Sequence, residues 1–228
     1  MGSEMCIRDS ANIDMKPEIL TEPVDTIVLD IGNVVCEWNP QKLIRMSYPL
    51  DSEPAEADVE QAIRDTVGHS DWLALDRGTL ALDDAIARAV ARSDLDADWI
   101  SSVYHNTPVS LAPLPDSVAA MHEASAAGFT IHILSNMQAH ASEYLLRTHA
   151  FFSLADKIIL SCECHLMKPE PAIYQHLIDA CNLEPGKSVF IDDMAENVEA
   201  AKACGLQSVQ LTDPNLGGQL IRQLIAAS

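Results

Sequence analysis

The sequence has few basic residues and no long apolar run. Lysine and arginine together number 14 among 228 residues, against 34 aspartates and glutamates, and the formal net charge is −20. This shortage of cations argues against binding to nucleic acids or anionic membranes, because phosphate contacts need clustered lysines and arginines. No stretch of about 18 apolar residues occurs, so we expect no membrane-spanning helix. An anionic substrate must therefore be attracted by a local site, since the field of the whole protein repels it.

The sequence also lacks the signs of secretion and of structural zinc. Its six cysteines do not have the spacing of a disulfide framework, so we expect reduced cysteines and a cytoplasmic protein. Cys162, Cys164 and His165 lie close together, but a second pair of ligands is missing, which disfavours a zinc site. The first ten residues, MGSEMCIRDS, lack the apolar centre of a signal peptide. We expect residues 1–14 to be non-native or disordered.

Strand and helix patterns alternate over most of the chain. Short apolar runs rich in β-branched residues predict buried strands at 26–29, 129–134, 157–160, 188–191 and 208–211. Helical periodicity between and after these runs predicts helices at 117–126, 139–148, 171–181, 196–204 and 216–226. Such alternation predicts an α/β fold, with a Rossmann-like three-layer core in which helices cover both faces of a parallel sheet.

Residues 40–107 differ from the rest of the chain, because they show helical periodicity and no convincing strand. The candidate helices lie at 41–47, 55–67, 81–92 and 96–105. We interpret this block as an inserted all-helical domain. Residues 15–39 and 108–228 would then form the core.

Four polar motifs follow apolar runs. They are Asp30 in IVLDIGNVV, Ser135 in IHILSNM, Lys168 in HLMKPEPAIY, and Asp192–Asp193 in SVFIDDMAEN. Three of them begin at the ends of predicted strands, and ligands of parallel sheets bind beyond those ends. We therefore expect these distant residues to meet at one edge of the sheet. Carboxylates, a hydroxyl and a lysine gathered in this way suit the handling of a phosphoryl group.

The order and spacing of these motifs resemble the haloacid dehalogenase-like hydrolase superfamily over about residues 24 to 212. The helical insert is similar to the cap of its type 1 cap subfamily. DIGNVV resembles the branch that contains sugar-phosphate phosphatases, such as glucose-1-phosphate phosphatase. The resemblance implies a magnesium-dependent hydrolase of small phosphorylated metabolites, with sugar phosphates among them. Such an enzyme would be a monomer or homodimer that binds neither nucleic acid nor membranes.

The resemblance also implies which residues react and hold the metal. Asp30 would be the catalytic nucleophile and would form an aspartyl-phosphate. Mg²⁺ would be held by Asp30, by Asp193 with Asp192 beside it, and by the backbone carbonyl of Gly32. Asn197 would help to orient the acidic loop.

Phosphate and substrate contacts follow from the same resemblance. Ser135, Lys168 and the backbone N–H of Asn136 would bind the phosphate, and Lys168 would also act in catalysis by holding the carboxylates in place. The helical insert would close over the site as a cap that selects the substrate. Trp38 and Arg77 are candidates for substrate contacts.

Gly32 departs from the commonest superfamily pattern, in which an aspartate at this place donates and accepts protons. Glycine can do neither, although the sugar-phosphate branch also has glycine here. The source of the catalytic proton is therefore open, with Glu37 as one candidate. Two alternatives to a phosphatase follow from Gly32. One is a dehalogenase or a phosphonoacetaldehyde-type hydrolase, the latter with Lys42 as its cap lysine, and the other is a non-catalytic phosphate-binding domain.

Overall fold

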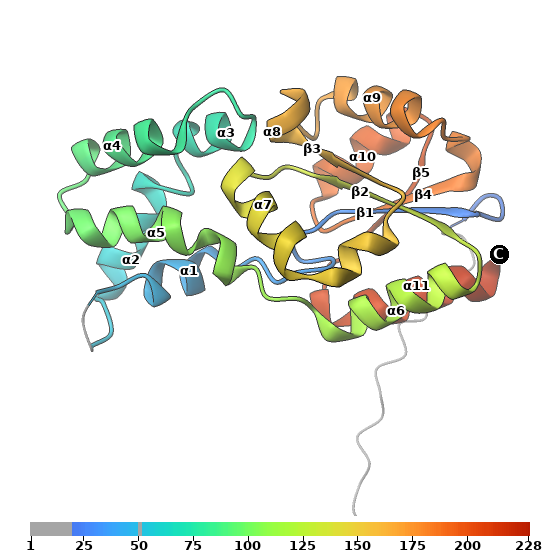
Figure 1. Ribbon diagram of the computed structural model, residues 1–228, viewed down its shortest axis with the longest axis horizontal. Coiled ribbons are helices and arrows are strands. Elements are labelled where there is room, and N and C mark those ends of the chain that lie inside the picture. Colours follow the sequence, from blue (N-terminus) through green and yellow to red (C-terminus); the bar gives the residue numbers. More distant parts are fainter. Residues whose placement is uncertain (1–19, 50–51) are drawn as a thin grey trace, which may run out of the picture.

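The computed structural model describes residues 20–49 and 52–228, so the expectations for residues 1–14 lie outside the described part. Its centre is a five-stranded parallel sheet in the order β3-β2-β1-β4-β5, which runs through the right-hand part of Figure 1. The strands are β1 (Thr26–Leu29), β2 (Thr130–Ser135), β3 (Lys157–Leu160), β4 (Ser188–Asp192) and β5 (Gln207–Gln210). The predicted α/β fold is confirmed, and each strand end lies within one residue of its predicted position.

Helices bury both faces of this sheet, which is why its strands are almost continuously apolar. Successive side chains of a strand point to opposite faces. Ile27 and Leu29 of β1 accordingly join one core cluster and Val28 joins another. The first cluster is covered by α6 (Pro115–Ala126), α7 (Ala139–Thr148) and α11 (Gly217–Ala227), and the second by α9 (Pro171–Cys181) and α10 (Ala195–Ala203).

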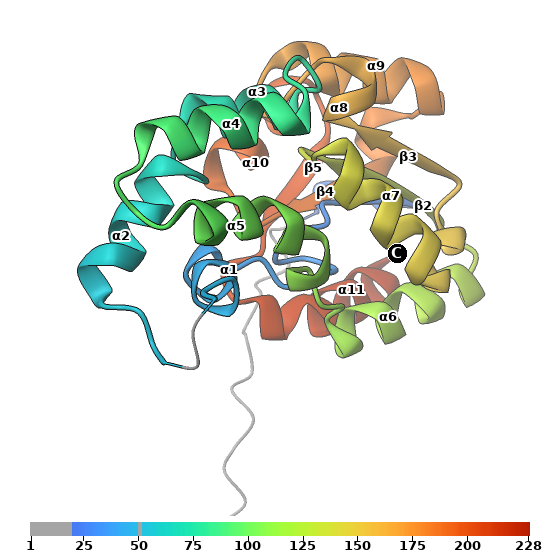
Figure 2. The same cartoon turned by 60° about the vertical axis from the view of Figure 1, so that its left-hand side comes forward.

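The inserted segment forms a helical cap with a core of its own, at the left of Figure 1. Its helices are α1 (Pro40–Met46), α2 (Glu56–Asp65), α3 (Ser70–Asp76), α4 (Leu82–Arg92) and α5 (Ala97–Ser110). Buried aromatic residues hold them together. The indole of Trp99 in α5 donates a hydrogen bond of 2.9 Å to the carbonyl of Ile44 in α1, and the rings of Trp72 and Tyr104 lie 5.2 Å apart. Figure 2 shows the cap as a layer beside the core sheet.

Three helical features differ from the sequence predictions. Helix α3 was not predicted, because its seven residues make about two turns and give too short a periodic pattern. Helix α5 continues to Ser110 through Pro108, a residue that usually ends a helix. The expected loop before Lys168 contains a further short helix, α8 (Ser161–Cys164). No helix in the described residues is long and apolar enough to cross a membrane.

Candidate active site

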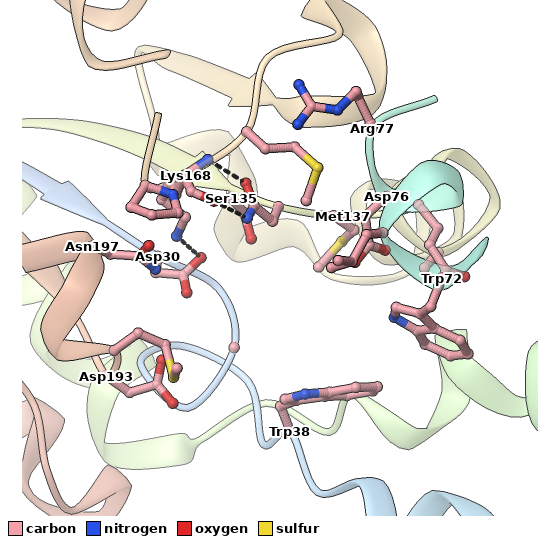
Figure 3. Close-up of a pocket in the computed structure, with 18 of the residues that line it drawn as sticks. Asp30, Trp38, Trp72, Asp76, Arg77, Ser135, Met137, Lys168, Asp193 and Asn197 are labelled. Carbon is pink, nitrogen blue, oxygen red and sulfur yellow. Dashed lines mark hydrogen bonds and ion pairs between the residues drawn. The ribbon is translucent and has the colours of Figure 1, made fainter. Parts of the chain in front are cut away.

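The polar motifs meet beyond the carboxyl ends of three adjacent strands. Asp30 follows β1 directly, Ser135 ends β2 and Asp192 ends β4. Lys168 reaches the same place from the loop between α8 and α9. Figure 3 shows Asp30, Ser135 and Lys168 gathered on one side of a cavity, with Asp193 below them in that view. The parallel topology therefore brings together residues that are more than a hundred positions apart in the sequence.

Lys168 is the centre of this cluster. Its Nζ lies 2.8 Å from Oδ1 of Asp30 and 2.6 Å from Oδ2 of Asp192, and all three residues are buried. Burial alone would lower the pKa of Lys168, but the two carboxylates outweigh it and the pKa is raised. Burial raises the pKa of Asp30 to about 6, although Lys168 opposes the change. The lysine therefore stays charged between two carboxylates.

The two neighbouring aspartates after β4 have different surroundings. Asp192 is fully buried, and its Oδ1 accepts hydrogen bonds from Nδ2 of Asn197 at 2.9 Å and from the backbone N–H of Met194 at 2.8 Å. Asp193 is half-buried, and its carboxylate accepts one hydrogen bond of 3.0 Å from Nδ2 of Asn33. Burial raises the pKa of Asp193. Asp192 thus holds Lys168 in place, whereas Asp193 keeps free lone pairs.

These carboxylates have the composition of a magnesium site. One oxygen from each of Asp30, Asp192 and Asp193 lies within 4.8 Å of the others. With Lys168 as their counter-charge, three ionised carboxylates leave the cluster with two excess negative charges. A further anion about 4 Å from one such charge is repelled by roughly 4 kcal/mol at an effective dielectric constant of about 20. A hard divalent cation fits oxygen donors of this kind and removes that repulsion.

The cysteine and histidine cluster does not form a comparable set. Within residues 20–49 and 52–228, the three aspartates are the one group placed to share a metal ion. Cys162 is buried, and Cys164 donates to the carbonyl of Leu160 in the preceding strand.

A cavity of about 540 Å³ extends from this cluster to the cap. Trp38 and Trp72 form part of its wall, with ring centroids 6.0 Å apart. Gly32 also lines it, and a Cβ added there would lie 3.5 Å from the Cβ of Trp38, an ordinary contact. Packing therefore does not demand glycine at position 32.

Comparison with known proteins places this architecture in a family. The model of the haloacid dehalogenase-like hydrolases matches residues 24–205, a range that contains all four motifs. The chain belongs to the haloacid dehalogenase-like hydrolases. The hydrolase is 25% identical over 198 residues to sesquiterpene phosphatase astK of Aspergillus oryzae, which covers 87% of this chain and 95% of that protein. It is 30% identical over 139 residues to (S)-2-haloacid dehalogenase 1 of a Pseudomonas species, covering 60% of this chain and 59% of the relative.

A solved structure supports the fold of the hydrolase. A family enzyme from Bacteroides thetaiotaomicron, in complex with magnesium and inorganic phosphate, gives a TM-score of 0.62 at 14% identity. The match covers 82% of this chain and 93% of that one. The relatives include phosphatases and dehalogenases, so the sugar-phosphate branch and the type 1 cap subfamily stay predictions.

Two asparagines organise the site of this hydrolase in ways that the sequence did not indicate. Oδ1 of Asn136 accepts from the backbone N–H of Lys168, and its Nδ2 donates to the carbonyl of the same residue, both at 2.9 Å. Asn33, at a positive φ of 55°, accepts from the backbone N–H of Trp38 while it donates to Asp193. The turn signal Gly32-Asn33 was visible in the sequence, but these contacts of its amide were not.

The two basic cap residues considered from the sequence, Arg77 and Lys42, already form ion pairs. The guanidinium of Arg77 lines the cavity but forms an ion pair with Glu170 of the core and donates to the carbonyl of His165 at 3.2 Å. Lys42 pairs with Glu37, and neither is among the described residues that line the cavity. Glu37 is therefore badly placed to replace the acid missing at Gly32.

Proposed function

We propose that this hydrolase is a magnesium-dependent phosphatase that cleaves monophosphate esters of small, largely apolar alcohols. The observation that carries the proposal is the buried Lys168 between Asp30 and Asp192, with Asp193 beside them in the cavity lining. This arrangement supplies a carboxylate nucleophile, a buried cation and a set of oxygen donors for a divalent metal in one place.

The residues suggest a sequence of steps. Two N–H groups of the Lys168 ammonium point to carboxylates, which leaves the third to donate to a phosphate oxygen with the Ser135 hydroxyl. An oxygen of Asp30 attacks phosphorus, the bond to the alcohol oxygen breaks, and water later hydrolyses the aspartyl-phosphate. Asp30, Asp193 and the Gly32 carbonyl would hold Mg²⁺, which when bound offsets the charge that builds up between carboxylate and phosphate.

The cavity lining supports an apolar alcohol more than a sugar. Outside the reacting cluster, the larger share of the lining side chains are aliphatic, aromatic or thioether groups: Trp38, Val67, Trp72, Leu73, Leu111, Met137, Ala141, Met167, Pro169 and Met194. The polar side chains there are Asp76, Arg77, Thr107, Gln138, Glu170 and Glu196. Sugar hydroxyls buried against the apolar part of this wall would lose hydrogen bonds to water without replacement. The similarity to a sesquiterpene phosphatase points in the same direction. We therefore favour a terpenoid-like monophosphate over a sugar phosphate.

A dehalogenase is the second candidate, favoured by Gly32 and by the haloacid dehalogenase relative. A 2-haloacid carries a carboxylate, which needs a free cation in the cavity. The two described cations that line the cavity are Lys168 and Arg77. Arg77 is paired with Glu170, and Lys168, held by two carboxylates, has one N–H left to donate, so a haloacid carboxylate would have that single donor beside the acidic cluster. A phosphonoacetaldehyde-type reaction lacks support because Lys42, its expected cap lysine, pairs with Glu37 outside the cavity lining.

The test is a substrate panel on the purified protein. It would contain farnesyl monophosphate, a hexose monophosphate and a chlorinated propionate, each with Mg²⁺ and with EDTA. We expect phosphate release with Mg²⁺, a higher kcat/KM for the farnesyl ester, and loss of activity in Asp30→Asn. Asp84→Asn, which alters an exposed carboxylate of α4, is the matched control and should behave as wild type. Turnover that survives EDTA or Asp30→Asn would contradict the proposal, and binding of phosphate without turnover would favour a non-catalytic domain.

A further inference from the structure

Asp76 ends cap helix α3 and lines the same cavity as Asp30. Figure 3 shows the two aspartates on opposite sides of the cavity, with Met137 and Trp72 close to Asp76. A nucleophile that attacks phosphorus in line expels the alcohol oxygen on the far side of the phosphorus atom. The proton for that oxygen must therefore come from a group on the cap side of the cavity, facing Asp30.

Contacts with the core fix the backbone of Asp76. The hydroxyl of Ser161 in α8 donates a hydrogen bond of 2.6 Å to the carbonyl oxygen of Asp76. Gly78 has a left-handed φ of 73° and lies so close to Cys162 that an added Cβ would collide with the carbonyl of that cysteine. Arg77 between them is paired with Glu170. These contacts hold the end of α3 against the core and keep Asp76 at the cavity wall.

The surroundings of Asp76 favour a carboxyl group that exchanges protons near neutral pH. Burial raises its pKa to about 7, and the nearby Gln138 amide opposes the change only in part. Gln138 also lines the cavity and is buried, yet within the described residues neither polar atom of its side chain has a hydrogen-bond partner. The titratable group that faces Asp76 from α8 is the Cys162 thiol, and within those residues no ion pair involves Asp76.

The other acidic groups of the cavity either have another role or partner, or lie on the core side. Asp30 is the proposed nucleophile, and Asp193 accepts from Asn33 at the proposed metal site. Glu170 is bound to Arg77. Glu196 lines the cavity but belongs to α10 on the core side and is exposed to solvent. Asp76 is thus the acid on the cap side that remains without an ionic partner among the described residues.

We propose that Asp76 is the catalytic acid and base of this hydrolase, replacing the carboxylate absent at Gly32. The inference rests on the proposed phosphatase function. As the bond from phosphorus to the alcohol oxygen breaks and the bond to Asp30 forms, the protonated Asp76 gives its proton to the departing oxygen. The Asp76 carboxylate then takes a proton from the water that attacks the aspartyl-phosphate, which releases phosphate and restores both aspartates.

The experiment compares Asp76→Asn with wild type on two substrates, farnesyl monophosphate and nitrophenyl phosphate. An alkoxide needs a proton to leave, whereas nitrophenolate leaves without one. We expect kcat/KM of the variant to fall about a hundredfold or more for the farnesyl ester and less than about threefold for the nitrophenyl ester. For the farnesyl ester, wild-type kcat/KM should fall as the pH rises through about 7, because the acid is lost, and this limb should be absent in Asp76→Asn.

Two controls separate this role from a structural one. Asp84→Asn should match wild type on both substrates, and the melting temperature of Asp76→Asn should be no lower than that of wild type. Carbon-13 NMR of labelled aspartates in the metal-free protein should show one carboxyl that titrates near pH 7 and disappears in Asp76→Asn.

The possible outcomes are distinct. An equal loss on both esters, no loss on either, or a retained limb in the pH profile would overturn the role of Asp76 and leave the phosphatase proposal intact. If the wild-type protein hydrolyses neither ester, both the role of Asp76 and the phosphatase proposal are overturned.

Discussion

Replacing Asp30, the proposed nucleophile, by asparagine should make the metal-free protein more stable. Asp30 is 7% exposed, and burial raises its pKa from 3.8 to about 6 even though Lys168 is 2.8 Å away. A carboxyl whose pKa is higher in the folded state is harder to ionise there than in the unfolded chain. A difference of about two pKa units corresponds to roughly 3 kcal/mol of lost stability at neutral pH. The amide of the Asp30→Asn variant carries no charge, so the variant should regain about that amount.

The stabilising effect of Asp30→Asn should depend on pH. Below pH 3.8 the Asp30 carboxyl is protonated in both the folded and the unfolded state, and the folded protein bears no cost of ionising it. Stability falls as the pH rises from 3.8 towards about 6, and it stays at the lower value above that pH. Urea denaturation in EDTA should therefore give similar unfolding free energies for wild type and Asp30→Asn near pH 4, and the largest difference at pH 7. For a protein of this size, about 3 kcal/mol corresponds to roughly 6–12 °C in melting temperature.

Asp84→Asn is the control for the general effect of removing one negative charge from a chain of net charge −20. It should change stability by less than about 0.5 kcal/mol, because Asp84 is exposed. If Asp30→Asn is no more stable than wild type at pH 7, or if its advantage does not grow between pH 4 and 7, the reasoning about burial is refuted.

Three further predictions concern the same site. Lys168→Met leaves two buried carboxylates without their cation and should lower the unfolding free energy by about 3–5 kcal/mol at pH 7, measured by urea denaturation; a loss below about 1 kcal/mol would contradict it. Asp193→Asn should weaken Mg²⁺ binding in calorimetry at least about tenfold, and an unchanged affinity would remove this residue from the metal site. Gly32→Asp should partly restore farnesyl ester turnover to Asp76→Asn, because an added Cβ meets Trp38 at an ordinary 3.5 Å; no gain in kcat/KM would contradict it.

The core and its reacting cluster could be predicted because they depend on local sequence patterns. Each buried strand is a short run of β-branched and apolar residues, and a polar residue ends or follows three of them at the same edge of the sheet. Parallel topology then decides which of these residues meet. Lys168 was harder to place from pattern alone, because it comes from a loop, and its position depended on the resemblance to a family.

The cap side of the cavity could not be predicted in the same way. Asp76 and Arg77 are adjacent in the sequence, yet the first lines the cavity without an ionic partner among the described residues, and the second binds Glu170. What separates their roles is the docking of α3 on α8, a contact across some 85 residues of sequence. Helix α3 is also too short to be recognised by periodicity, so neither the element nor its orientation was available from the chain.

A carboxyl group on the cap changes how proton transfer depends on conformation. An acid two residues after the nucleophile would stay in the core whether the cap is open or closed. Asp76 reaches the cavity only while α3 is docked, and the ion pair between Arg77 and Glu170 that helps to dock it is partly exposed, at 32% and 44%. Such a pair contributes less than about 1 kcal/mol by itself, so the docking depends mainly on the hydrogen bond from Ser161 to Asp76 and on the close approach of Gly78 to Cys162. The proposed proton donor would therefore be available only while these contacts between cap and core are in place, so proton transfer would depend on the docking of the cap as well as on the residues of the core.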